Sequence, residues 1–428
     1  MTSNISTNKK LILGLQHVLA MFGSTVLVPF LTGLDPAIAL LAAGVGTLLF
    51  HLCAQGKVPV FLGSSFAFIG AIAVTLNPDG MNLVALTSPE NSAYYLENLA
   101  NVKGGIIAAG IVYSVIALII RFIGVDAVKK LFPPIVTGPI IMVIGLNLSP
   151  VAINSAFYNE GALDVKFIVI SSIVVITMIT VSIFFKGFFK LVPILISVIV
   201  GYVASIILGV YDFSALQNIE FFSLGDPYFR AKILTPPNFN VQSIMAIAPI
   251  ALVVFIEHIG DITTNGAVVG KNFLVDPGVH RTMLGDGVAT IFAGFIGGPA
   301  NTTYSENTGV LAVTKVYDPK ILRIAAVFAI VFSMIGHLAA LLRTIPGPVM
   351  GGVSIILFGM IASVGVRILI NANLDFSHSR NLMISAVILV LGIGIGSAGL
   401  TIGNITMSGL AIAAVVGVIA NKILPEEI

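Results

Sequence analysis

The sequence predicts an all-α polytopic membrane protein, and three observations lead to this fold class. Of its 428 residues, 57% are hydrophobic and only 9% are charged, whereas soluble domains carry about 25% charged residues. Charge-free stretches of the length that a spanning helix needs, about 20 residues, recur along the whole chain. Several motifs of the first half also return in the second half. Because so few charges cannot solvate a soluble fold of this size, the expected solvent is the lipid bilayer.

The charge-free stretches give the expected membrane segments. They cover 11–34, 36–56, 58–78, 104–120, 131–159, 167–185, 191–211, 233–256, 287–305, 324–342, 344–366 and 381–421. The last one is long enough for two spans, with a break near Gly403 and Asn404. A short apolar stretch at 307–314 supplies part of one more segment, which makes fourteen. No cleavage site of small residues follows the first stretch, so we expect a span there rather than a removed signal peptide.

The basic residues predict that both termini lie in the cytoplasm. With fourteen segments and this orientation, five of the 21 Lys and Arg residues fall in outer loops: Lys103, Lys166, Arg230, Lys232 and Arg343. The other sixteen lie at cytoplasmic ends, which is the bias expected for a multi-pass protein of the inner cell membrane. The net charge of +2 gives no reason to expect nucleic acid as a partner.

Three pairs of motifs occur in the same order in the two halves. The pairs are Gln16-His17 with Glu257-His258, Ser64-Ser65-Phe66 with Thr302-Thr303-Tyr304, and the thirteen residues from Pro134 with those from Pro348. Each repeat then holds seven segments. Because seven is odd, the second repeat is inverted in the membrane, as in many secondary transporters. Chance matching of apolar sequence is the alternative interpretation.

Four acidic residues lie within or beside the expected spans: Glu257, Asp261, Asp286 and Glu306. An ionised carboxylate at the centre of a spanning helix costs at least about 2.5 kcal/mol, so each is a functional candidate. The alternative is a structural pairing inside the bundle, which for Asp286 has nearly equal weight. Glu257 and Asp261 are one helical turn apart, and two close carboxylates do not both ionise easily. One of them would hold a proton at neutral pH, as a proton symporter requires. His258 is expected either to relay that proton or to pack as a neutral histidine.

Two matching segments, 63–68 and 301–309, interrupt the hydrophobic pattern with small hydroxyl residues and an aromatic residue. Broken segments at corresponding places of two repeats indicate a binding site near the middle of the membrane. Backbone groups freed there need partners, which a planar polar ligand supplies. Phe66 and Tyr304 are the expected stacking residues, and Ser65, Asn307 and Asp286 are secondary candidates.

The chain resembles the nucleobase–ascorbate transporter family, and within it the bacterial uracil permeases. The matching stretches are 15–29 (LQHVLAMFGSTVLVP), 62–70 (LGSSFAFIG), 257–260 (EHIG), 301–315 (NTTYSENTGVLAVTK) and 348–359 (PVMGGVSIILFG). The run from Glu306 to Lys315 fits the family's signature. The resemblance extends over essentially the whole chain.

The resemblance implies a core domain (1–130 and 233–343, spans 1–4 and 8–11) and a gate domain (131–232 and 344–428, spans 5–7 and 12–14). Discontinuous segments 3 and 10 would each contain a short β-strand. Uracil would bind Glu257, Glu306 and the backbone at Phe66 and Ser305, with Tyr304 beside it. The implied function is uracil uptake in symport with protons, without a cofactor and without enzymatic activity. Asp261, Glu257 and His258 would then couple transport to the proton.

Two residues differ from the uracil permeases, which have histidine in place of Asp261 and glycine in place of Ser305. The aspartate is more similar to the purine-transporting branch, so a xanthine or other purine:proton symporter is the alternative of the same class. An anion exchanger or channel with the same inverted repeat is the alternative of another class, although it needs no paired buried carboxylates. The expected partners are uracil, protons and the bilayer, and a homodimer is left open.

Overall fold

The computed structural model describes residues 6–81, 83–124, 130, 132–213, 216, 219–396, 399–402 and 405–425. Seven helical stretches among them are long and apolar enough to cross a membrane: Thr7–Thr32, Pro36–Cys53, Pro89–Ile123, Pro134–Phe157, Val165–Phe184, Val241–Val269 and Gly347–Asn371. Shorter apolar helices cover Phe66–Leu76, Pro193–Ile207, Ser379–Ile395 and Gly409–Ile423. The chain is therefore a mostly helical protein with several membrane passes.

The first half of the chain is built from helices, with a short strand, β1, near the centre and a small hairpin farther on. Its elements are α1 (Thr7–Thr32), α2 (Pro36–Cys53), β1 (Leu62–Ser64), η1 (Phe66–Phe68), α3 (Ile69–Leu76), α4 (Leu83–Leu86), η2 (Pro89–Asn91), α5 (Ser92–Ile123), α7 (Pro134–Asn147), α8 (Ser149–Phe157), β2 (Tyr158–Asn159), β3 (Ala162–Leu163), α9 (Val165–Phe184), η3 (Phe189–Leu191) and α10 (Pro193–Ile207). The strands β2 and β3 form a small hairpin between α8 and α9.

The second half again places a short strand, β4, among helices and has a second small strand pair near its end. It contains η5 (Ser223–Gly225), α11 (Pro227–Leu234), α12 (Val241–Ile247), η6 (Ala248–Ile250), α13 (Ala251–Val269), η7 (Leu274–Gly278), α14 (Val279–Ile296), β4 (Asn301–Thr303), α15 (Ser305–Thr314), α16 (Pro319–Met334), α17 (Gly336–Arg343), α18 (Gly347–Asn371), α19 (Ser379–Ile395), β5 (Leu400–Ile402), β6 (Ile405–Met407) and α20 (Gly409–Ile423). The apolar stretch 381–421 divides into two helices as predicted, although Gly403 and Asn404 lie outside the described residues.

Capping side chains explain where many of these helices begin. An Asp, Asn or Ser side chain accepts a hydrogen bond from a backbone N–H of the first turn, which such orphan donors require. These residues are Asp35, Asp164, Asp226, Asn240, Asp318 and Ser408, before α2, α9, α11, α12, α16 and α20. At the other end, α1 stops at Gly33, whose φ of 83° is a left-handed conformation that favours glycine.

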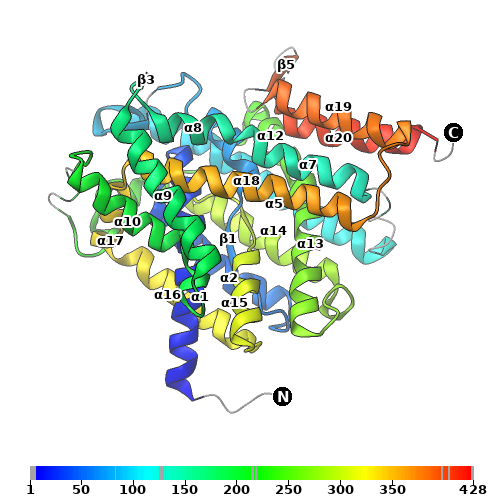
Figure 1. Cartoon of the computed structure of the whole chain (residues 1–428), viewed down its shortest axis with the longest axis horizontal. Helices are drawn as coiled ribbons and strands as arrows, with labels where there is room; N and C mark the ends of the chain where they lie inside the picture. The colour runs from blue at the N-terminus through cyan, green and yellow to red at the C-terminus, as the bar shows by residue number, and fades with distance from the viewer. Residues whose placement is uncertain are drawn as a thin grey trace.

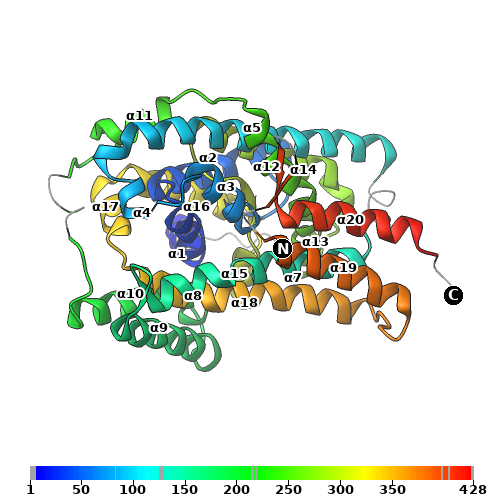
Figure 2. The same cartoon turned by 90° about the horizontal axis from the view of Figure 1, so that it is seen from above.

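The helices pack into two groups, and each group takes helices from both halves of the sequence (Figure 1). In the first group, α14 packs against α2 and α5, and α16 packs against α1 and α2. In the second group, α18 packs against α7, α8 and α9, and α19 packs against α7 and α20. Figure 2 shows α2, α5 and α14 on one side of the molecule and α8, α9 and α18 on the other.

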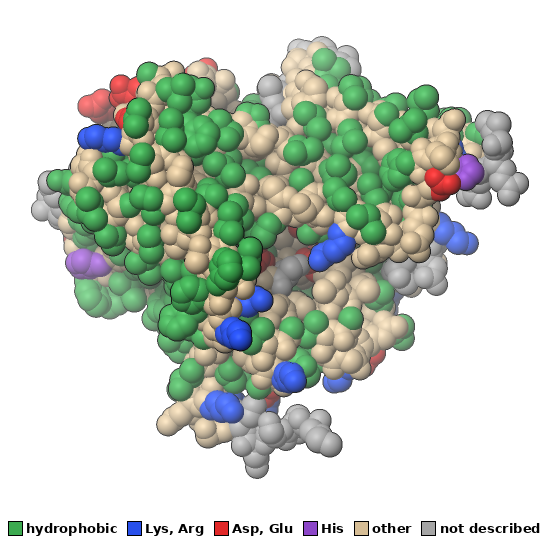
Figure 3. All heavy atoms as spheres, viewed as in Figure 1, with side chains coloured by type: hydrophobic (Ala, Val, Ile, Leu, Met, Phe, Trp, Pro, Cys, Tyr) green, Lys and Arg blue, Asp and Glu red, His purple; other side chains and the backbone are tan. Residues whose placement is uncertain are grey.

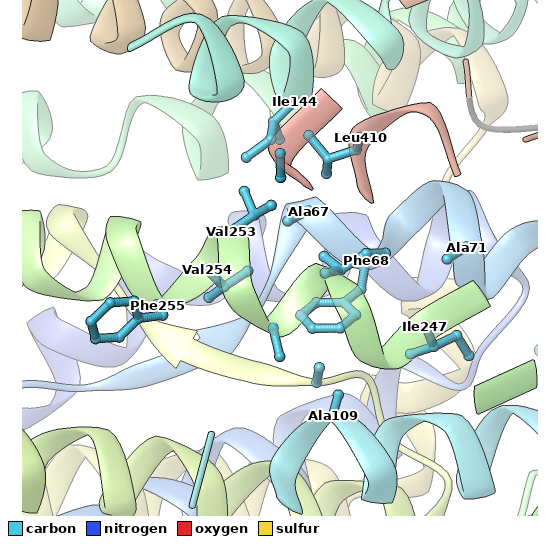
Figure 4. Close-up of a cluster of buried hydrophobic side chains, with 14 of the residues drawn as sticks. Ala67, Phe68, Ala71, Ala109, Ile144, Ile247, Val253, Val254, Phe255 and Leu410 are labelled. Atoms are coloured by element: carbon cyan, nitrogen blue, oxygen red, sulfur yellow. The ribbon is translucent and has the colours of Figure 1, made fainter. Parts of the chain in front are cut away.

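The largest cluster of buried apolar side chains joins α3, α5, α7, α13 and the first turns of α20 (Figure 4). Its members include Phe68, Ala71, Ile247, Val254 and Phe255, which Figure 4 labels. This packing helps to fix the segment that follows β1, because α3 packs against α1, α5 and α12. The outer surface is also rich in apolar side chains, such as the 78% exposed Phe122 and the 77% exposed Ile207 (Figure 3).

A buried ion triad joins three helix ends. Asp35, which caps α2 and is only 2% exposed, lies 2.9 Å from Lys232 Nζ and 2.6 Å from Arg343 Nη2. Burial opposes ionisation of this carboxyl, but the two cations outweigh it and hold the pKa of Asp35 below its ordinary value. Lys103, fully buried, donates to the carbonyl oxygens of Ile233, Thr235 and Phe295. Three of the five basic residues expected in outer loops thus have partners inside the protein.

Candidate functional site

The two broken segments meet as a pair of antiparallel strands. In the register of β1 and β4, Leu62 lies opposite Thr303 and Ser64 lies opposite Asn301. Two further hydrogen bonds extend the pair, from Ser65 N to Ala300 O at 2.8 Å and from Tyr304 N to Phe61 O at 3.2 Å. The expectation of a short strand in each broken segment is therefore confirmed.

Each strand leads directly into the N-terminus of a helix. After β1, η1 begins at Phe66, and after β4, α15 begins at Ser305. Neither helix N-terminus receives a hydrogen bond from the side chain that precedes it. The first backbone N–H groups of a helix have no partner within the helix, and they favour electron-rich ligand atoms. The strand crossing therefore brings together two sets of backbone donors at Phe66 and Ser305.

Phe66 and Tyr304 lie with their rings parallel beside this crossing. The interplanar angle is 7° and the ring centroids are 6.3 Å apart. Tyr304, 4% exposed, also donates its hydroxyl to Ser64 O at 2.7 Å. Its ring lies on the backbone of Gly63, where an added Cβ would come within 2.4 Å of ring carbons. Phe66 further meets Phe358 of α18 edge to face, which links the crossing to the second helix group.

Three half-buried carboxylates lie around the crossing. Glu257 and Asp261 are on α13, one turn apart as predicted, and Glu306 is in the first turn of α15. Ser24 Oγ on α1 donates to Glu306 Oε1 at 3.1 Å, and Thr303 Oγ1 donates to Asp261 Oδ2 at 2.9 Å. The charges of Asp261 and Glu306 both act on Glu257. Acidic atoms are visible inside the hollow in the middle of the face in Figure 3.

His258 and Asp286 form a separate buried pair behind the carboxylates. His258 Nδ1 is 2.8 Å from Asp286 Oδ2, and its Nε2 is 2.9 Å from Thr282 Oγ1. Both residues are fully buried and hold α13 against α14. His258 is therefore hydrogen-bonded inside the bundle, and its role in relaying a proton stays a prediction. Asp286 has a partner inside the bundle, and whether it also takes part in function stays a prediction.

The secondary candidates Asn307 and Ser65 are both buried next to the crossing. Asn307 Oδ1 lies 2.8 Å from His17 Nδ1 of α1, while its Nδ2 has no partner in the described part of the chain. The Ser65 hydroxyl is fully buried and has no hydrogen bond to any described residue. Across the described ranges, no three His, Cys, Asp or Glu side chains gather as a metal site.

Sequence reasoning missed Ser24 and Thr303 as partners of the carboxylates. Ser24 lies seven residues after His17, which is about two turns of a helix. Thr303 belongs to the second broken segment. The only feature of the sequence that pointed to these two residues was that each lies in or next to a motif repeated in the two halves. Which side chain each would meet depends on how α1, α13 and α15 pack, and that is visible only in the fold.

Comparison with known proteins identifies the family. Residues 8–399 match the model of the Permease family. The chain belongs to this family. Its predicted resemblance to the nucleobase–ascorbate transporters is thereby confirmed, and the protein is a permease rather than an enzyme. Within this permease the matched region includes every site residue described above.

Two curated relatives are similar to this permease over nearly its whole length. It is 42% identical to the uracil permease of Bacillus subtilis strain 168 over 417 residues, which are 96% of this chain and 92% of that protein. It is 40% identical to the uracil permease of Escherichia coli strain K12 over 426 residues, or 97% and 93% of the two chains.

A solved structure shares the fold of this permease. The match is the murine solute carrier 26 family member A9 anion transporter in its inward-facing state, with a TM-score of 0.69 and 12% identity. It covers 98% of this chain and 68% of that one. At such low identity the likeness shows a common fold and carries no information about the transported species.

Proposed function

We propose that this permease imports uracil across the cytoplasmic membrane together with protons. One observation carries the proposal: the carboxylates Glu257 and Glu306 lie around a strand crossing whose two helix N-termini receive no hydrogen bond from the side chain that precedes them. Uracil has two ring N–H donors and two carbonyl acceptors in one plane. The carboxylates accept from the N–H groups, and the backbone amides at Phe66 and Ser305 donate to the carbonyls. The 40–42% identity to proteins named uracil permeases supports the same substrate.

The aromatic pair limits where the ring lies. A third ring inserted between two others needs about 7 Å between them, twice a carbon contact of about 3.5 Å. The centroids of Phe66 and Tyr304 are 6.3 Å apart, so uracil lies against this pair rather than between its rings. The Ser65 hydroxyl, which is buried and unpartnered among the described residues, and Asn307 are the secondary contacts.

For proton coupling we propose the pair of Glu257 and Asp261. Carboxylates as close as these do not all carry charge at once, so a proton is shared between them and moves with the substrate. His258 connects the pair to Asp286 on α14 and is the third coupling residue of the proposal. The proton is the coupling ion, and the proposal includes no other cofactor.

The architecture proposed for transport is a fourteen-segment 7+7 inverted repeat. A core domain, 1–130 and 233–343, carries the strand crossing, and a gate domain, 131–232 and 344–428, lies beside it. The two helix groups support this division, because α1, α2, α5, α14 and α16 pack together and α7, α9, α18 and α19 pack together. The distribution of basic residues supports cytoplasmic termini, since Lys103, Lys232 and Arg343 are engaged inside the protein.

Asp261 favours one second candidate, a purine:proton symporter, because it resembles the aspartate of the purine-transporting branch. Uptake of labelled uracil into cells that lack a uracil permease distinguishes the two. We expect uptake that a protonophore abolishes and that excess unlabelled uracil, but not xanthine, suppresses. Glu97→Gln, an exposed carboxylate on α5, is the matched control for Glu257→Gln. Xanthine uptake without uracil uptake would replace the proposal by the purine alternative, and uptake insensitive to the protonophore would refute proton coupling.

A further inference from the structure

The side chain of Ser24 makes a different hydrogen bond from most other hydroxyls in the helices. Ser and Thr inside a helix commonly donate to the carbonyl four residues earlier in the same helix. In this permease the residues that do so include Thr32, Ser114, Thr177, Ser197, Ser205, Thr263, Thr264, Thr314, Ser354 and Ser363. Ser24 instead donates across to Glu306 Oε1 on α15. The hydroxyl is thus directed to the proposed binding site.

The surroundings of this bond make it rigid. Ser24 is fully buried in the middle of α1, which shields its hydroxyl from solvent. The neighbouring contact between His17 and Asn307, at 2.8 Å, holds the first turn of α15 against α1 independently. The Glu306 carboxylate also accepts from its own backbone N–H. Removing the Ser24 hydroxyl would therefore loosen the carboxylate without releasing the helix that carries it.

We infer that Ser24 is a positioning residue that sets the orientation of the Glu306 carboxylate before the substrate arrives. A bond from a fixed donor to Oε1 restricts the rotation of the carboxylate, and with it the directions that Oε2 can take. A preorganised acceptor binds its donor without the cost of ordering a flexible side chain. Ser24 thereby decides which ring N–H is recognised through Glu306. The inference rests on the proposed function, since it requires Glu306 to accept from the substrate.

The test compares competition by 1-methyluracil and 3-methyluracil against labelled uracil bound to purified protein. A methyl group on a ring nitrogen removes one N–H, so each analogue reports on one carboxylate acceptor. We expect Ser24→Ala to bind uracil about tenfold more weakly, as for one lost buried hydrogen bond. In the wild type, each methyl group is expected to weaken competition against labelled uracil. In Ser24→Ala this loss of affinity should become smaller for the analogue methylated at the nitrogen that Glu306 binds, and it should stay the same for the other analogue. Ser205→Ala is the matched control, because Ser205 is equally buried but bonds within its own helix.

A double-mutant cycle supplies the second measurement. The amide of Glu306→Gln still occupies the site. In that background, adding Ser24→Ala should reduce the binding free energy for uracil by less than half as much as Ser24→Ala does in the wild type. Equal loss of affinity for both methyluracils, or fully additive effects of the two changes, would overturn the inference in favour of a packing role. Wild-type protein that fails to bind uracil at all would instead refute the proposed function, so the two failures are distinguishable.

Discussion

Gly63 makes room for the Tyr304 ring, and Gly63→Ala is the most specific test of the strand crossing. The added Cβ would lie 2.4 Å from Tyr304 Cε2 and Cζ, whereas carbon atoms in contact lie about 3.5 Å apart or more. The ring must therefore move by about 1 Å or more. Its hydroxyl bond to Ser64 O, now 2.7 Å, would break. Overpacking of this kind costs about 1–3 kcal/mol, and the lost hydrogen bond about 1 kcal/mol.

Uracil binding to purified protein measures this prediction. If the displaced ring costs the bound state about 1.4 kcal/mol or more, the dissociation constant rises at least about tenfold. Gly394→Ala on α19 is the matched control, because a Cβ there meets no atom within 4 Å. A Gly63→Ala protein that binds uracil like the wild type, with unchanged thermal stability, would refute the geometry of Tyr304 described here.

Four further substitutions test separate parts of the account. Glu257→Gln should abolish uracil uptake while the protein remains folded in the membrane, and normal uptake would exclude this carboxylate from the site. Glu306→Ala should weaken uracil binding about ten- to hundredfold in a binding assay, because a buried donor loses its acceptor; unchanged binding would give Glu306 a structural role. Asp261→Asn should retain binding but lose accumulation against a gradient, whereas an Asp261→Asn protein that still concentrates uracil would leave coupling to Glu257 alone. Asp35→Asn should lower unfolding stability by about 3 kcal/mol, because two cations lose their buried partner; a thermal melt like that of the wild type would contradict this.

The membrane class and the broken segments were predictable because they depend on local sequence. Hydrophobic stretches show in composition alone, and 63–68 and 301–309 each interrupt such a stretch with small hydroxyl residues. Glu257 and Asp261 were predictable as neighbours because a spacing of four residues defines one helix face. The structure has these features as β1, β4 and α13.

The partners of the site residues were not predictable, because they come from distant parts of the chain. Ser24 and Glu306 are 282 residues apart, and Arg343 and Asp35 are 308 apart. The hydrophobic periodicity of a helix or strand gives no information about contacts between residues so far apart in the chain. The sequence indicated that 58–78 is interrupted and that 307–314 is only part of a span, and α3 and α15 are indeed short helices. Its hydropathy did not indicate that both begin at one crossing. Strand pairing across the two repeats, rather than hydropathy, decides where they start.

Uracil-dependent proton movement in proteoliposomes tests the central claim most directly. Purified permease is reconstituted with a pH-sensitive dye inside the vesicles, and uracil is added outside under an inwardly directed proton gradient. The account predicts that labelled uracil accumulates inside and that the interior acidifies faster in its presence. Both signals should disappear in Glu257→Gln and persist in Glu97→Gln. Uracil that enters without accelerating acidification, or that accumulates equally after the gradient is collapsed, would contradict proton-coupled uptake.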